Sequence, residues 1–201
     1  MTALPKEGIG WTELRERLDD AGKGDVDWRG GRVPMFIHYA GDDVLEVAKQ
    51  AYLMYFSENG LGLRAFGSLA RFESEVVRMA LTLMHGDGAT RGAMTTGGTE
   101  SIFLAVKAAR DRAMKRRPGM GTPRIVMAVS AHPAFDKAAH FMGLEAVRTP
   151  LRADFTADPA AIASATTDDT VMVVGSVPAF PHGVVDPIAE IAAVASANGA
   201  M

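Results

Sequence analysis

A glycine- and threonine-rich segment in the middle of the chain is the first candidate for chemistry. Residues 94–101 read Met-Thr-Thr-Gly-Gly-Thr-Glu-Ser, and the helical pattern that follows ends in the basic run 115–117. Backbone N–H groups at a helix N-terminus, together with the helix dipole, bind anions such as phosphate. The segment is therefore a candidate anion site, with an ordinary tight turn into the helix as the alternative.

The segment matches neither of the common nucleotide-binding motifs. No Gly-Lys-Ser/Thr sequence follows it, and the glycine spacing differs from that of the dinucleotide fingerprint. The carboxylate of Glu100 must point away from any bound anion, because it would repel it.

Two further segments carry imidazole and hydroxyl groups. His132 follows the apolar run 125–129, and Ser176 and His182 follow the apolar run 171–174. Short continuous apolar runs are typical of strands buried on both faces, and ligands bind at the carboxyl ends of such strands. We therefore expect these segments and the glycine-rich segment at one edge of a sheet. For His132 the alternative is a histidine that caps the next helix or is satisfied within its loop. For residues 175–183 the alternative is a rigid proline loop.

The elements that position these segments alternate between strand and helix. This order predicts an α/β fold with a parallel sheet flanked by helices. Asp158 and Asp186 each precede a proline and are expected to cap a helix, whereas Asp136 and Lys137 are expected on a solvated helix face. Apolar patterns and the two Asp-Pro starts predict helices over 11–20, 44–57, 72–84, 102–117, 135–142, 159–165 and 187–197, and strands over 125–129, 145–149 and 171–174. An extended segment is expected over 32–37, because the residue before a proline avoids the helical region.

Composition excludes several classes of function. The 201 residues carry a net charge of −3, which gives no indication of a nucleic-acid or anionic-membrane partner. The chain has no cysteine, so it holds neither a disulfide scaffold nor a thiolate metal site. Its histidines lack metal-binding spacing, and Ser176 lacks the Gly-x-Ser-x-Gly elbow of many hydrolases. With no signal-peptide pattern and no apolar run near the roughly 20 residues of a membrane span, we expect a cytoplasmic protein.

Three blocks in this order resemble a known family. Residues 94–101, 130–139 and 175–187 are similar to the pyridoxal-phosphate-dependent lyases of the sphingosine-1-phosphate lyase family, within the group II decarboxylase superfamily. The resemblance implies part of the large domain of the type I aspartate-aminotransferase fold, working as a homodimer. Residues 1–60 would form an N-terminal helical arm, and residues 61–201 an incomplete large domain that binds pyridoxal phosphate.

The resemblance also implies roles for individual residues. Gly98 and Thr99 would hold the phosphate of pyridoxal 5′-phosphate, and His132 would stack on its pyridine ring. Ser176 would lie near the cofactor, and His182 would act in catalysis beside the substrate. That substrate would be a small-molecule amine, a phosphorylated long-chain base, cleaved to a fatty aldehyde and phosphoethanolamine.

This sequence differs from the family pattern in several residues that would bind the cofactor or the substrate. The family places an aspartate for the pyridinium nitrogen and a Schiff-base lysine after the helix at 187–197, and none of the six lysines here lies in the family's lysine motif. Gly62 stands where a histidine is frequent. We therefore expect a truncated chain that is inactive alone. Two alternatives stay open: a pyridoxal-phosphate-dependent amino-acid decarboxylase, and a non-catalytic module that binds a phosphorylated ligand or a protein partner.

Overall fold

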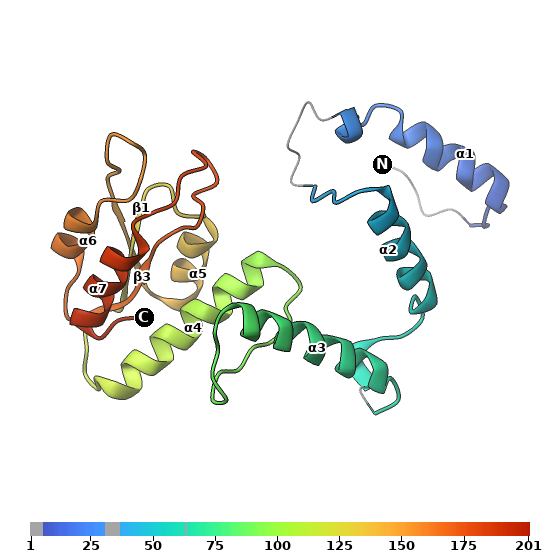
Figure 1. The fold of residues 1–201 in the computed structure, drawn as a ribbon. Coiled ribbons are helices and arrows are strands. Elements are labelled where there is room, and N and C mark those ends of the chain that lie inside the picture. Colours follow the sequence, from blue (N-terminus) through green and yellow to red (C-terminus); the bar gives the residue numbers. More distant parts are fainter. Residues whose placement is uncertain (1–5, 31–36, 63) are drawn as a thin grey trace. The chain divides into compact units, whose positions relative to one another are not determined.

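A computed structural model describes residues 6–30, 37–62 and 64–201, and its contacts divide the chain into two compact units, Met1–Ala70 and Arg71–Met201 (Figure 1). Of the extended segment expected over 32–37, only Ile37 lies within the described residues.

The first unit consists of helices joined by short turns. It contains α1 (Trp11–Gly22), η1 (Trp28–Gly30), α2 (Asp42–Met54) and η2 (Gly60–Gly62), and α3 (Gly67–Leu83) begins in it. None of its described residues is buried. Helices in proteins gain most of their stability from packing an apolar face, so this unit lacks a core of its own within the described residues.

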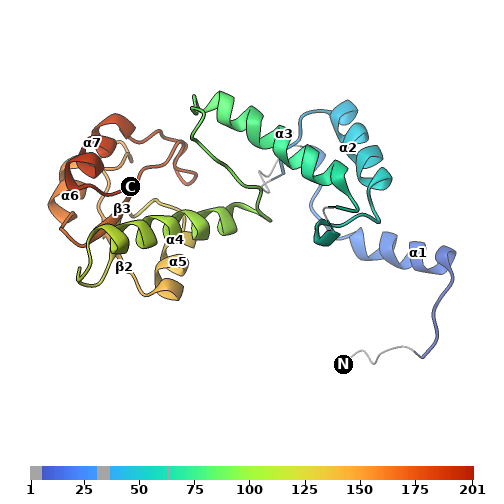
Figure 2. The same ribbon diagram turned by 90° about the horizontal axis from the view of Figure 1, so that it is seen from below.

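The second unit is an α/β structure, which confirms the predicted fold class. Strands β1 (Arg124–Ala128), β2 (Glu145–Thr149) and β3 (Thr170–Val174) form a parallel sheet in the order β2-β1-β3. Its helices are α4 (Gly98–Arg116), α5 (Ala134–Met142), α6 (Pro159–Ala165) and α7 (Ile188–Asn198). Helices α6 and α7 lie on one side of the sheet, and α4 and α5 lie on the other (Figures 1 and 2).

The central strand is buried on both faces, and this is why its sequence is continuously apolar. Ile125 and Met127 pack into the cluster formed with α4 and α5, whereas Val126 and Ala128 pack against α6 and α7. All four are at most 1% exposed. The alternation of side chains along a strand distributes them between the two helical layers.

Helix α4 begins earlier than predicted, and this changes the position of two candidate residues. The helix begins at Gly98 rather than at residue 102, so Gly98 and Thr99 lie in its first turn. The amide groups of a first turn have no helical acceptor. Helix α3 likewise begins earlier than expected, at Gly67 instead of residue 72.

The residues after α7 enter the sheet beside β3. The N–H of Met201 donates to the carbonyl of Val171 (3.0 Å), and the N–H of Val173 donates to the carbonyl of Met201 (2.7 Å). This is the hydrogen-bonding pattern of a parallel ladder. Among the described residues, no helix combines the length and the apolar character needed to cross a bilayer.

Candidate functional site

The glycine-rich segment forms the exposed N-terminus of α4. Gly97 is the N-cap, and the first helical hydrogen bond runs from the N–H of Ser101 to the carbonyl of Gly97 (3.1 Å). A Cβ atom placed on Gly97 or Gly98 would meet no atom within 4 Å. Packing within the described chain therefore does not require glycine at Gly98, although glycine weakens a helix by about 1 kcal/mol relative to alanine. The open space leaves the backbone of the first turn accessible to a ligand.

The carboxylate of Glu100 is held by its own loop. It accepts hydrogen bonds from the N–H (2.7 Å) and the hydroxyl (2.6 Å) of Thr96. The Thr96 hydroxyl and then its amide lower the pKa of Glu100 below its ordinary value. Thr95 and Ser101 hydroxyls lie 2.7 Å apart across the same turn. Side chains of the loop thus fix its conformation, and Thr99 remains exposed beside the first-turn amides.

His132 is exposed in the loop between β1 and α5. Its Nδ1 atom accepts a hydrogen bond from the N–H of Ala134 (3.1 Å), so the capping role considered as an alternative is present. An accepting Nδ1 places the proton of the neutral ring on Nε2. Because the bond uses only one edge of the ring, the cap leaves a face of the imidazole available for stacking.

Arg148, which the sequence analysis did not identify, holds this loop from strand β2. Its Nη1 atom donates to the carbonyls of Ala128 (2.9 Å), Val129 (3.2 Å) and Ala131 (2.9 Å). Its Nε and Nη2 atoms donate to the carboxylate of Asp136 on α5. The side chain of Asp136 is 45% exposed, as expected on a solvated helix face, and it also pairs with Arg148, because the parallel register carries Arg148 to the end of β1.

Asp186 joins two loops instead of capping α7. Its carboxylate is buried, 3% exposed, and accepts the N–H groups of Ser176 and Ala157, each at 2.8 Å. Pro187 is the N-cap of α7 and no side chain caps it, so the capping prediction for Asp186 is wrong. The same prediction for Asp158 is confirmed, since its carboxylate accepts the N–H of Ala160 (2.9 Å). The two Asp-Pro pairs differ in burial, which local sequence does not determine.

His182 is exposed at the far end of the loop that begins at Ser176. Its imidazole stacks on the ring of Phe155, with centroids 4.7 Å apart and planes inclined by 8°. Phe155 belongs to the turn between β2 and α6, a segment in which the sequence analysis found no candidate residue.

The predicted site residues lie around one core cluster. The first turns of α4, through Ile102 and Phe103, pack on the cluster that contains Ala131 and Val174, which stand at the carboxyl ends of β1 and β3. Within the described ranges, no hydrogen bond or ring contact joins Gly98, Thr99, His132, Ser176 and His182 to one another. The structure therefore brings their supporting elements together, and a ligand would have to bridge the side chains.

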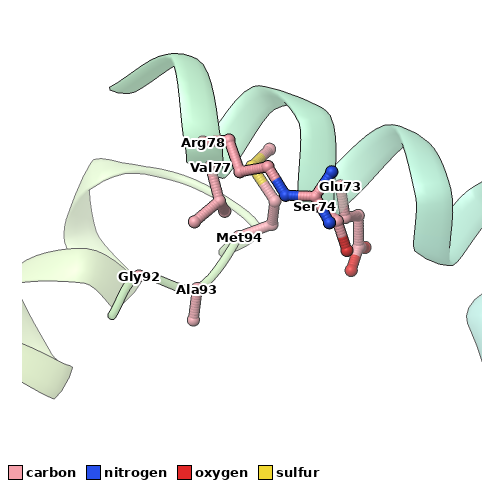
Figure 3. A pocket seen from close by; sticks show the side chains of 7 residues that line it. All are labelled: Glu73, Ser74, Val77, Arg78, Gly92, Ala93 and Met94. Atoms are coloured by element: carbon pink, nitrogen blue, oxygen red, sulfur yellow. The ribbon is translucent and has the colours of Figure 1, made fainter. Parts of the chain in front are cut away.

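A separate groove lies between α3 and residues 92–94, which lead into the glycine-rich turn (Figure 3). It has a volume of about 420 Å³, and the Arg78 side chain extends along α3 toward Glu73 within it. The groove is lined by Glu73, Ser74, Val77, Arg78, Gly92, Ala93 and Met94. Gly98, Thr99, His132, Ser176 and His182 are not among its lining residues. In the part of the chain that the structure describes, no three histidine or acidic side chains are grouped as a metal site.

Comparisons with known proteins support the family resemblance. The chain is 40% identical over 192 residues to mouse sphingosine-1-phosphate lyase 1, covering 96% of this chain and 34% of the relative. It is 37% identical over 204 residues to the Arabidopsis thaliana sphingosine-1-phosphate lyase, covering 98% and 37%. A probable L-tyrosine/L-aspartate decarboxylase of Methanosarcina acetivorans is 29% identical over 207 residues, covering 97% and 51%. No protein-family model matches the chain.

Solved structures are also similar to this chain. The sphingosine-1-phosphate lyase of Burkholderia pseudomallei superimposes with a TM-score of 0.90 at 34% identity, covering all of this chain and 48% of that one. Glutamate decarboxylase of Lactobacillus brevis shares the fold, with a TM-score of 0.86 at 19% identity, covering 99% and 46%. The chain thus spans about a third of the length of the two lyases that it matches in sequence.

Proposed function

We propose that this chain, which belongs to the sphingosine-1-phosphate lyase family over the part that it spans, supplies the phosphate- and ring-binding side of a pyridoxal 5′-phosphate site in a carbon–carbon lyase. The observation that carries the proposal is the open glycine pair at the N-terminus of α4. There, exposed amides and the helix dipole favour a phosphate, and no neighbouring side chain occupies the space.

The residues present fit this cofactor. The first-turn amides and the Thr99 hydroxyl would donate to the phosphate, and the Thr96 contacts keep the Glu100 carboxylate engaged. His132, fixed through its Nδ1 atom, would lay its exposed face on the pyridine ring. Bound pyridoxal phosphate supplies an electron sink for the bond broken at the substrate.

The chain's own residues would orient the substrate and handle its proton. Ser176 would lie beside the cofactor, held through its backbone N–H by Asp186. The exposed imidazole of His182 would exchange a proton with the substrate hydroxyl. Histidine commonly acts as a general acid or base in enzymes. We infer a phosphorylated long-chain base as substrate of the whole protein, with a fatty aldehyde and phosphoethanolamine as products.

Substitution of Gly98 by alanine tests the cofactor site. The methyl group would fill the space assigned to the phosphate, so we expect at least tenfold weaker binding of pyridoxal phosphate, measured by absorbance titration. We expect no loss of stability, because alanine is the better helix former by about 1 kcal/mol. Gly67→Ala in the first turn of α3 is the matched control, since that position is also open. Equal cofactor affinity in both variants and the wild type would contradict the proposal.

Amino-acid decarboxylation is the second candidate, favoured by the similarity to the probable L-tyrosine/L-aspartate decarboxylase. Assays of the enzyme that contains this chain distinguish the two reactions, because a lyase releases aldehyde and a decarboxylase releases carbon dioxide. Cofactor-independent binding of phosphate esters without either product would instead favour a non-catalytic binding module.

We also propose that the whole protein is a homodimer. Apolar side chains on helix α3 are largely exposed, including Val76 (49%), Met79 (68%) and Leu83 (78%). Contiguous exposed apolar surface is rare on monomers and marks an interface, and a second copy of the chain is the occupant that the family resemblance implies.

A further inference from the structure

Phe155 has a backbone conformation that aromatic residues rarely adopt. Its φ is 65°, and His85 is the other non-glycine residue with positive φ in the described ranges. In this region the Cβ atom crowds the following carbonyl oxygen. Such residues persist where the surrounding structure imposes them, and they cluster at functional sites.

The strain comes from the turn that Phe155 completes. The N–H of Arg152 donates to the carbonyl of Thr156 (2.9 Å), and the N–H of Phe155 donates to the carbonyl of Arg152 (3.0 Å). Leu151 and Ala157 pair across the base of the turn. In a three-residue hairpin of this kind the last loop position is left-handed and is usually glycine. A glycine would suit the backbone better, so the backbone does not explain the aromatic side chain.

Core packing does not explain the side chain either. Phe155 is 54% exposed, and its described ring contact is the parallel stack on His182. Asp154 stiffens the turn beneath it by accepting hydrogen bonds from the N–H (3.0 Å) and the hydroxyl (2.7 Å) of Thr156. The ring of Phe155 is thus presented to His182 from a rigid base.

The two loops are also tied together below the stack. The carboxylate of Asp186 binds the N–H of Ala157 at the end of one loop and the N–H of Ser176 at the start of the other. A loop that is fixed at its base by hydrogen bonds and near its tip by a stacked ring cannot turn its imidazole freely. The His182 side chain is therefore restricted in orientation although it is exposed.

From these contacts we propose that Phe155 is a positioning residue that fixes the orientation of the His182 imidazole for catalysis. The proposal rests on the role proposed for His182 and adds the residue that orients it. Phe155 itself contacts neither cofactor nor substrate in this proposal.

The first test follows the imidazole directly. The Hδ2 or Hε1 proton of His182 should resonate upfield in the NMR spectrum of the wild-type chain, because the imidazole stacks on the face of the Phe155 ring with centroids 4.7 Å apart. Phe155→Tyr retains the ring and should retain the shift, whereas Phe155→Leu should remove it. Phe141→Leu is the control, since that exposed ring contacts Phe103 and His140 instead. His182 resonances that are identical in wild type and Phe155→Leu would overturn the proposal, whatever the activity.

The second test uses the enzyme that contains this chain. We expect Phe155→Leu and Phe155→Gly to lower kcat about tenfold with KM within about twofold, because misorientation of a catalytic group affects the chemical step. Phe155→Tyr, which keeps the aromatic ring, should retain the wild-type kcat. Phe155→Gly should melt at the same or a higher temperature than wild type, since glycine relieves the strain, and this excludes unfolding as the cause.

A double mutant separates positioning from an unrelated effect. If Phe155 acts through His182, then Phe155→Leu combined with His182→Ala should be no slower than His182→Ala alone. Wild-type kcat in Phe155→Leu, or additive losses in the double mutant, would overturn the proposal. A wild-type enzyme without lyase or decarboxylase activity, but with the ring-current shift and its loss in Phe155→Leu, would reject the proposed function and leave the positioning contact established.

Discussion

The hydrogen bonds of Asp186 lead to a specific prediction for the free energy of unfolding. Its buried carboxylate satisfies the N–H of Ala157, which is itself fully buried, and the N–H of Ser176. A buried donor left without a partner costs about 1–3 kcal/mol. Asp186→Ala should therefore lower the free energy of unfolding by about 2–4 kcal/mol, and Asp186→Asn, which keeps one acceptor, should lower it by less.

Urea unfolding of the three proteins measures these differences. Asp158→Ala is a suitable reference, because it removes a helix cap at the surface and should cost about 1 kcal/mol. A loss for Asp186→Ala no larger than that of Asp158→Ala would show that the loops do not depend on the buried carboxylate.

Glu100 gives the glycine-rich loop a dependence on pH. Hydrogen bonds from Thr96 lower the pKa of Glu100 in the folded chain. Because the folded pKa lies below the unfolded one, the ionised carboxylate stabilises the loop above the unfolded pKa. That contribution is lost as the pH falls through the folded pKa, below the ordinary glutamate value of 4.5.

The amide proton of Thr96 reports this transition in NMR spectra recorded from neutral pH downward. We expect its resonance to be constant at neutral pH and to move upfield in the acid range, as the charge-assisted hydrogen bond weakens. In Glu100→Gln the same resonance should be insensitive to acid. An identical acid transition in both proteins would assign the effect to another group.

The backbone conformation of Phe155 is unfavourable, whereas its ring contact with His182 is favourable. A left-handed conformation costs a residue with a Cβ atom roughly 1–2 kcal/mol, and an aromatic pair returns about 0.5–1.5 kcal/mol. The two magnitudes are similar, so the stack with His182 offsets the strain without a large net gain. The contact is therefore better explained by orientation of the imidazole than by stability.

At the scale of elements, Arg148 connects strand β2 to the loop that carries His132. One guanidinium binds three carbonyls at the end of β1 and the carboxylate of Asp136 on α5. Lysine offers a single point of attachment in place of this fork. We expect Arg148→Lys to cost about 1–3 kcal/mol, because two part-buried carbonyls, those of Ala128 and Ala131, lose their donor.

Thermal and urea unfolding measure this cost, and Arg152→Lys provides the control. Arg152 is more exposed, and its ion pairs with Asp158 and Glu190 are long, at 3.8 and 3.7 Å, so that substitution should change the stability by less than about 0.5 kcal/mol. Equal effects of the two substitutions would mean that Arg148 does not hold the loop.

The sequence was sufficient to predict β1 and β3, because strands buried on both faces contain continuous apolar runs, and β2, which is less buried, from the alternation of its side chains. It was also sufficient to locate the candidate loops, since the carboxyl ends of parallel strands share an edge. The contacts that organise those loops were not predictable. Asp186 reaches Ala157 across 29 residues and Arg148 reaches Ala131 across 17, and such pairs depend on strand order and loop conformation.

At the scale of the whole molecule, the distribution of burial separates the two units. Among the described residues, the buried core lies in the second unit, around the parallel sheet. The helices of the first unit carry apolar side chains without burying them, among them Val47 (69%) and Leu53 (67%). Exposure of this extent in both α2 and α3 predicts association rather than a monomer in water.

Helix α3 allows the proposed dimer to be tested with a matched pair of substitutions. Met79→Glu places a charge on the exposed apolar stripe of Val76, Met79 and Leu83, whereas Thr82→Glu adds the same charge on the polar side of the helix. Burying an unpaired carboxylate in an interface is strongly unfavourable, so Met79→Glu should weaken dimerisation of the whole protein at least tenfold. Thr82→Glu should leave the association constant within about twofold, as expected for charges at an exposed rim.

Sedimentation equilibrium over a range of concentrations measures the association constants of both variants. If the two variants associate as strongly as the wild type, the α3 stripe is not the dimer interface, and if only Thr82→Glu dissociates, the interface uses the other side of the helix.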